Sequence, residues 1–142
     1  MLNEEVRNIM TKKPVVVHPD DSIQELFKKM ESFKLQQVPV VDDENHFLGL
    51  ITTYDLWRNS SGPSDDKKVK DVMATKVIQI MPKDKVGTAA ELFMDKRFKT
   101  LPVVNLRNEL KGVVTAFDVI RHTLKKEYPH AILYSDIINE GS

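Results

Sequence analysis

Apolar residues recur along the chain at spacings that indicate helices and strands in alternation. Ile23, Leu26, Phe27 and Met30 occupy positions i, i+3, i+4 and i+7, which predicts an amphipathic helix. Short runs rich in valine and isoleucine, bounded by proline or polar turn residues, predict strands. These runs cover residues 15–17, 38–41, 47–52, 77–80, 101–104 and 110–115. Further helices are expected to begin near residues 54 and 117, so the predicted order is β-α-β-β-α, twice.

The first helix of each copy has a predicted start. Ser22 and Glu25 have the spacing of a capping box, in which the serine side chain accepts a backbone hydrogen bond at the helix start. Residues 86–93 repeat the apolar stripe in the second copy, and Asp84 is the expected cap there.

The pattern is an internal repeat with a period of 63 residues and no gap. Between residues 6–58 and 69–121, 13 of 53 positions are identical, against about three expected from average composition. The Pro-Val-Val at 39–41 returns at 102–104, and the glycine, threonine and aspartate at 49, 52 and 55 return at 112, 115 and 118. A polar linker at 59–66 separates the copies. We predict a duplicated unit, with a first motif at 1–62, a second at 63–126 and a tail at 127–142.

Composition narrows the classes of function. The 142 residues include 21 basic and 21 acidic side chains, so a net charge of zero disfavours binding to nucleic acid. There is no cysteine, and the four histidines show no metal-ligand spacing, so no metal site is predicted. No apolar stretch approaches the roughly 18 residues of a membrane span, and the opening residues do not form a secretory signal. The expected location is the cytoplasm.

Two composite motifs carry a resemblance to a known family. Val-Pro-Val-Val-Asp at 38–42 precedes Gly-Leu-Ile-Thr-Thr-Tyr-Asp at 49–55, and Leu-Pro-Val-Val-Asn at 101–105 precedes Gly-Val-Val-Thr-Ala-Phe-Asp at 112–118. This arrangement resembles the CBS motif, over residues 1–126. The resemblance implies an α/β (α+β) fold in which two pseudo-symmetric β-α-β-β-α motifs pack sheet to sheet. It also implies two clefts for an adenosyl ligand such as AMP, ADP, ATP or S-adenosylmethionine, and no required cofactor.

The repeated Thr-x-x-Asp has two interpretations. The hydroxyls of Thr52 and Thr115 can donate to ribose or phosphate, and the carboxylates of Asp55 and Asp118 can accept both ribose hydroxyls. The same spacing is also a helix-capping motif, with threonine at the N-cap and the acid three residues on. A residue can serve both roles, and duplication copies caps as readily as binding sites.

Other contacts are implied by the resemblance alone. A basic residue five positions before the Pro-Val strand, here Lys34 or Arg97, reaches phosphate in the family, although a solvated charge at a helix end is the alternative. The segments leading into the first strands contact adenine, and each shares a cleft with the Thr-x-x-Asp of the other copy. Their candidate residues are Thr11, Lys12, Pro14, Val15, Thr75, Lys76 and Val77. Pro14 departs from the family pattern and lacks a backbone N–H. We predict tighter binding in the cleft with Thr115 and Asp118.

The leading functional hypothesis is a regulatory module that senses an adenosyl nucleotide. No nucleophile, acid–base pair or metal cluster can be assembled, so the chain is not expected to be an enzyme. The alternative is a structural dimerisation module with degenerate clefts. Homodimerisation is expected through the second helices, around Leu56, Trp57, Val119 and Ile120. The sequence does not identify the protein that such a module would regulate.

Overall fold

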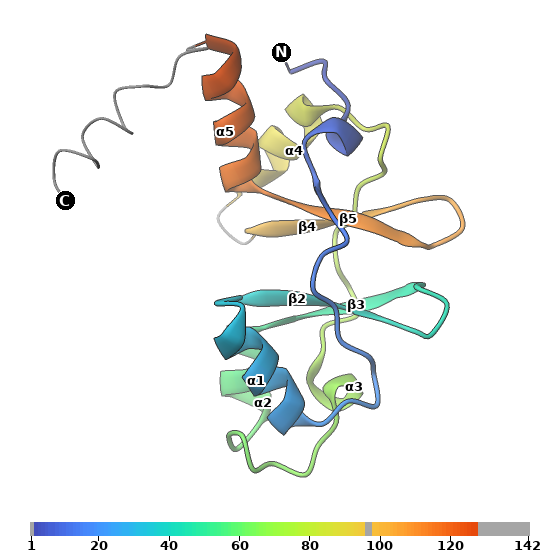
Figure 1. Ribbon diagram of the computed structural model, residues 1–142, viewed down its shortest axis with the longest axis vertical. Helices are drawn as coiled ribbons and strands as arrows, with labels where there is room; N and C mark the ends of the chain where they lie inside the picture. The colour runs from blue at the N-terminus through green and yellow to red at the C-terminus, as the bar shows by residue number, and fades with distance from the viewer. Residues whose placement is uncertain (1, 96–97, 128–142) are drawn as a thin grey trace, which may run out of the picture.

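In a computed structural model of the chain, two β-sheets face each other across the middle of the molecule, and helices cover their outer sides (Figure 1). The structure describes residues 2–95 and 98–127. One sheet has the strand order β1-β5-β4, and the other pairs β2 with β3. This arrangement confirms the predicted mixed α/β fold of two motifs packed sheet to sheet.

The main elements follow the predicted order in both copies. The first copy contains α1 (Ile23–Ser32), β2 (Gln37–Val41), β3 (Phe47–Thr52) and α2 (Thr53–Asn59). The second contains α4 (Val86–Phe93), β4 (Thr100–Val104), β5 (Leu110–Thr115) and α5 (Ala116–Glu127). Shorter elements precede them, namely η1 (Val6–Asn8), β1 (Thr11–Lys12) and α3 (Val69–Val72). None of the described helices is long and apolar enough to cross a membrane.

Two local predictions are wrong. Residues 15–17 and 77–80 are not strands, because each run makes only one parallel bridge, Val17 to Val40 and Ile80 to Val103. Both runs connect the halves of the molecule, and their buried end residues belong to two different cores. Asp84 does not cap α4: the N-cap is Lys85, and the Asp84 carboxylate accepts the Met81 N–H at 2.7 Å. The Ser22 cap is confirmed, since its hydroxyl accepts the Glu25 N–H.

The two halves exchange their helical lead-ins. Val6 of η1 is fully buried in the core formed by the second motif, whereas Val69 and Val72 of α3 are buried in the core of the first. The chain therefore crosses between the halves twice (Figure 1). The predicted boundary between residues 62 and 63 describes the repeat in the sequence and remains a prediction. In the structure, each core includes the lead-in of the other copy.

A third group of apolar residues joins the two sheets. Val41 and Phe47 pack with Val104 and Leu110, which occupy matching places on the second sheet. The hairpin turns also bond to each other through two asparagines. The Asn45 side-chain amide donates to the Leu110 carbonyl at 2.8 Å, and Asn108 donates to the Phe47 carbonyl at 3.0 Å. These reciprocal bonds explain why asparagine is retained at both positions, and they make the two motifs one module.

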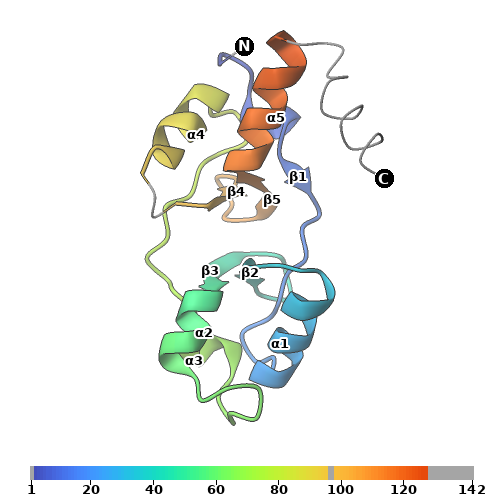
Figure 2. The same cartoon turned by 90° about the vertical axis from the view of Figure 1, so that its left-hand side faces the viewer.

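The outward faces of α2 and α5 expose large apolar side chains. Both helices are visible in Figure 2, one below and one above the facing sheets. Trp57 and Ile120 are 79% and 55% exposed, as a dimer contact requires, but the prediction is wrong for Leu56 and Val119, which are buried. The remaining members of the exposed set are Tyr54, Phe117 and Leu124. We call these five residues, Tyr54, Trp57, Phe117, Ile120 and Leu124, the helical face.

Candidate functional site

Both Thr-x-x-Asp motifs cap the helices that they precede. The Thr52 hydroxyl oxygen accepts the Asp55 N–H at 3.0 Å, and the Asp55 carboxylate accepts the Thr52 N–H at 3.0 Å. Thr115 and Asp118 make the same reciprocal pair at 3.1 and 2.9 Å. The capping interpretation is therefore confirmed in both copies. These bonds hold each threonine at the point where a strand ends and its helix begins.

The two aspartates differ in their surroundings. Asp118 is buried, and its second carboxylate oxygen accepts a hydrogen bond from the Arg121 guanidinium at 2.9 Å. Asp55 is only partly buried, and its Oδ2 also accepts a bond from the Thr52 hydroxyl at 2.9 Å. Arg58, the counterpart of Arg121, has no ion-pair partner within the described part of the chain. A ligand hydroxyl approaching Asp118 would have to share that carboxylate with Arg121.

A cavity of about 510 Å³ lies where the two halves meet, beside the first residues of β2 and β4. It is lined by Thr11, Lys13, Pro14, Val15, Lys34, Leu35, Gln36, Gln37, Pro39, Lys99, Thr100, Val113 and Thr115. We call it the Thr115 cleft. β1 forms part of the wall because it pairs with β5 in antiparallel register, Thr11 opposite Val113. The end of the first lead-in thus lies along the strand that carries Thr115.

Five of the predicted site residues line the Thr115 cleft: Thr11, Pro14, Val15, Lys34 and Thr115. Lys12 does not, because successive side chains of a strand point to opposite faces. It lines a neighbouring hollow with Arg7 and Lys111, and Lys13 borders both this hollow and the cleft. Asp118 also lies outside the cleft, in a smaller cavity of about 270 Å³ with Arg121 and His122.

The corresponding residues of the other copy lie along β3. Ala74 bridges Leu50, which places the segment after it beside the strand that ends at Thr52. Thr75 and Lys76 are exposed there, and Val77 packs against the apolar group between the sheets. Arg97 lies outside the described residues.

Several lining residues were not predicted from the sequence, among them Gln36, Gln37 and Lys99. The repeat held a signal for them, because it pairs Gln36 with Lys99 and Gln37 with Thr100, and all four residues line the cleft. Lys13 belongs to the segment 11–15 that was expected to bring positive charge to this cleft. The side-chain oxygen of Gln37 is buried and has no hydrogen-bond partner among the described residues. Gln37 lines the cleft, but this oxygen is not exposed to it.

The polar lining of the Thr115 cleft consists of hydroxyl, amide and ammonium groups. Such groups bind and orient a ligand through hydrogen bonds and charge. Across residues 2–95 and 98–127, no group of three or more histidine or carboxylate side chains is arranged to hold a metal ion.

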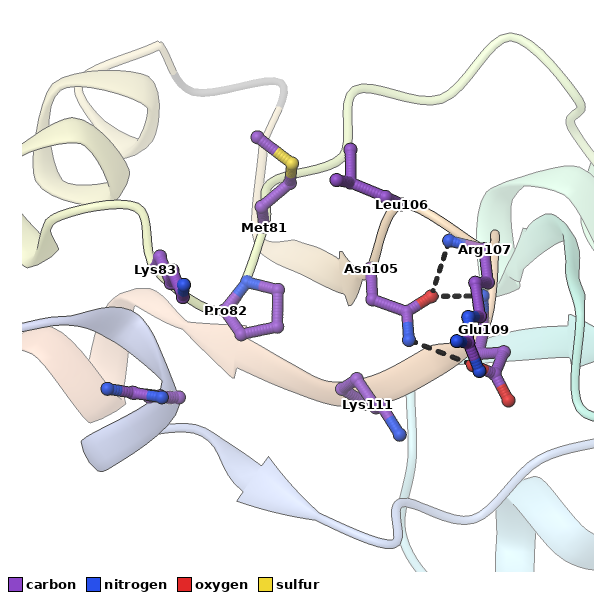
Figure 3. Close-up of a pocket in the computed structure, with 9 residues that line it drawn as sticks. Met81, Pro82, Lys83, Asn105, Leu106, Arg107, Glu109 and Lys111 are labelled. Atoms are coloured by element: carbon purple, nitrogen blue, oxygen red, sulfur yellow. Dashed lines mark hydrogen bonds between the residues drawn. The ribbon is translucent and has the colours of Figure 1, made fainter.

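A second cavity, of about 540 Å³, lies beside the β4–β5 turn (Figure 3). It is lined by Arg7, Met81, Pro82, Lys83, Asn105, Leu106, Arg107, Glu109 and Lys111. The Asn105 amide donates to Glu109 at 2.9 Å, and this bond, with nearby Lys111 and Arg107, holds the pKa of Glu109 below its usual value. At the positions of Lys83, Arg107 and Lys111 the first copy has Asp20, Glu44 and Leu48. The charge of this cavity is therefore not part of the duplicated motif.

Comparison with known families agrees with this geometry. The family model described as the CBS domain matches residues 6–56 and again residues 69–125. The chain belongs to the CBS-domain family. Its two CBS motifs form a CBS pair, and the Thr115 cleft lies between the motifs of that pair.

Relatives of this CBS pair include a short protein and a much longer enzyme. Inosine-5'-monophosphate dehydrogenase of Methanocaldococcus jannaschii is 32% identical over 123 residues, which are 87% of this chain and 24% of the dehydrogenase. The chain thus spans about a quarter of that relative and matches only its CBS part. An uncharacterized 17.7 kDa protein of Acidianus ambivalens is 29% identical over 84% of this chain and 73% of its own length.

Solved CBS pairs have the same fold. The structure of CBSX2 in complex with AMP matches with a TM-score of 0.79 and 26% identity, covering 87% of this chain and 98% of that one. The CBS domain pair of protein MJ0100, in complex with 5-methylthioadenosine and S-adenosyl-L-methionine, matches with a TM-score of 0.74 and 25% identity, over 87% and 98%. Adenosyl ligands therefore bind to proteins with this fold.

Proposed function

We propose that this CBS pair is a regulatory sensor that binds an adenine nucleotide and does not convert it. The observation that carries the proposal is the Thr115 cleft, where the two motifs together enclose a ligand-sized space. The AMP complex of CBSX2 supports the choice of ligand class. The cleft offers Thr11 and Thr115 hydroxyls for hydrogen bonds and the apolar surfaces of Val15 and Val113 for a base. A cytoplasmic location remains part of this proposal.

Sensing would follow from the position of the cleft between the halves. A ligand that binds there contacts β1 and β5 as well as the turn after α1, so it links elements of both motifs. Binding to the folded state alone stabilises that state by an amount that rises with the logarithm of ligand concentration above the Kd. A change in the rigidity or relative position of the halves is the signal that an attached or separate protein would read.

A ligand panel tests this function directly. With AMP, ADP or ATP at 100 times its Kd, we expect the folded state to gain about 2.7 kcal/mol, seen as a melting temperature raised by several degrees. Uridine monophosphate is the control, because it carries ribose and phosphate without a purine. Phosphate release from ATP should stay at background. No shift with any adenine nucleotide, or stoichiometric turnover abolished by a change in the cleft, would overturn the proposal.

The helical face supports self-association, which is also the basis of the alternative function as a dimerisation module. Tyr54 and Trp57 occupy the same places in the first copy as Phe117 and Ile120 in the second, so four of the five residues of the helical face form duplicated pairs. Exposed apolar patches of this kind mark interaction sites. A twofold contact between copies would bury both patches at once.

We expect the chain to sediment at twice its monomer mass of 16.3 kDa at micromolar concentration. Trp57→Glu combined with Ile120→Glu should shift it to the monomer mass, because a charge buried in an apolar contact is unfavourable. Leu106→Glu is the matched control, since Leu106 is 93% exposed but lies on the β4–β5 turn away from the helices. A wild-type chain that sediments only as a monomer would refute the dimer.

A further inference from the structure

The Thr115 cleft is unusually cationic for a neutral protein. Lys13 follows β1, Lys34 follows α1 and Lys99 precedes β4, so three separate segments each bring one lysine to the same cavity. Its thirteen described lining residues include no aspartate or glutamate. The chain as a whole carries equal numbers of basic and acidic side chains. The cleft therefore concentrates positive charge without a local counter-charge.

None of these three ammonium groups has a hydrogen-bond or ion-pair partner among the described residues. Other lysines of the chain are engaged: Lys29 donates to the Val16 carbonyl at 2.9 Å, and Lys70 pairs with Asp20 at 3.1 Å. Like charges gathered around one cavity repel each other, and an anion placed between them relieves that repulsion. The free ammonium groups thus favour a negatively charged occupant.

The backbone at two of the lysines is strained. Lys13 and Lys34 have φ values of 52° and 54°, in the left-handed region that glycine prefers. The other non-glycine residues in this region, over the described part of the chain, are Asn45 and Asn108, a residue type that adopts it more readily. Lys34 lies just past the end of α1, at a position where glycine is the usual choice. Strained residues of this kind cluster at ligand-binding sites.

The charge and the strain differ between the copies. Lys76 is the second-copy counterpart of Lys13. The backbone of Lys76, unlike that of Lys13, is not in the left-handed region. Gln36 is the first-copy counterpart of Lys99. Lys34 likewise has a basic counterpart, Arg97, so Lys99 is the one lysine of the set whose charge is not shared by the other copy.

We infer that the Thr115 cleft selects its nucleotide by phosphate charge, with ATP and ADP favoured over AMP and with S-adenosylmethionine disfavoured. This inference rests on the proposed function and specifies the ligand class of the same site. Each added phosphate provides acceptors for a lysine that is otherwise unpaired. S-adenosylmethionine has no phosphate: its sulfonium and ammonium groups outweigh its single carboxylate, so it brings a net positive charge to three lysines. The expected preference for ATP over AMP is about tenfold, and it should decrease as salt is added.

Calorimetric titration of the full chain with ATP, ADP, AMP and S-adenosylmethionine, at low and high salt, tests the inference. Lys34→Gly removes one ammonium group and suits the left-handed backbone, so its preference for ATP over AMP should fall severalfold while the protein stays folded. Lys34→Arg should retain the preference. Lys28→Ala is the control, because Lys28 is an exposed lysine of α1 outside the cleft.

The outcomes separate this inference from the proposed function. A second variant, Lys99→Ala, removes another lysine of the cleft. The charge selection would be overturned by equal affinity for ATP and AMP, by tighter binding of S-adenosylmethionine, or by an unchanged preference in both Lys34→Gly and Lys99→Ala. Each of these results would still leave a nucleotide sensor. Binding of none of the four ligands would overturn the sensor itself. A preference for ATP that is lost in Lys34→Gly and kept in Lys28→Ala would establish the selection.

Discussion

Replacing Gly112 by alanine is expected to lower the free energy of unfolding by about 2–3 kcal/mol and to weaken nucleotide binding. A Cβ at this position would lie 2.6 Å from the Thr11 carbonyl oxygen and 2.9 Å from the Met10 sulfur. The methionine can move, but the carbonyl belongs to β1, which pairs with β5 at this point. The clash would therefore separate β1 from β5 and displace the wall of the Thr115 cleft.

Gly87→Ala provides a control with the same chemical change. Gly87 lies in α4, and its nearest neighbour would be the Leu2 carbonyl oxygen at 3.3 Å. Alanine is a better helix former than glycine, so this variant should be neutral or up to about 1 kcal/mol more stable. Urea denaturation measures both. A Gly112→Ala chain as stable as the wild type, with unchanged affinity, would mean that β1 does not stay against β5 in solution.

Replacing Asp118 by alanine should lower stability by about 2 kcal/mol, more than the change of about 1 kcal/mol expected for Asp55→Ala. Both variants lose a helix cap. Asp118 is also buried and bonded to Arg121, so its removal leaves the Thr115 N–H and the guanidinium without their acceptor. Because Arg121 is half exposed, water compensates for part of that loss.

The same pair of variants tests the ribose role of Asp118. If this carboxylate accepts ribose hydroxyls, Asp118→Ala should reduce nucleotide affinity about 10- to 150-fold. Calorimetric titration and a melting curve on each variant separate the two effects. Lower stability with unchanged affinity would leave Asp118 as a cap alone. Affinity retained in Asp118→Ala and lost in Asp55→Ala would reverse the predicted order of the two clefts.

Local structure in this protein was readable from the sequence wherever short-range patterns determine it. The strands at 47–52 and 110–115 have the predicted bounds, and α1 begins at the predicted cap. Strand alternation, helical spacing and a capping serine are properties of residues close together in the sequence. They can therefore be recognised without knowing which surface the element packs against. The 63-residue repeat likewise predicted the pseudo-symmetry. That Thr11 and Thr115 share one site was implied by the resemblance of the motifs to the CBS family, and the cleft contains both.

Only the tertiary structure decided which segments meet. The sequence assigns η1 to the first copy, yet Val6 is buried in the second core, because the chain crosses between the halves. Leu56 and Trp57 are consecutive apolar residues of one helix. Leu56 is buried and Trp57 is exposed, and the packing of the helix decides which is which. Gly112 is required by a carbonyl about 100 residues away in the chain, and Lys13, Lys34 and Lys99 converge only after both motifs have packed. Hydrophobic periodicity specifies that a residue has a partner surface; which surface it meets depends on contacts between residues far apart in sequence.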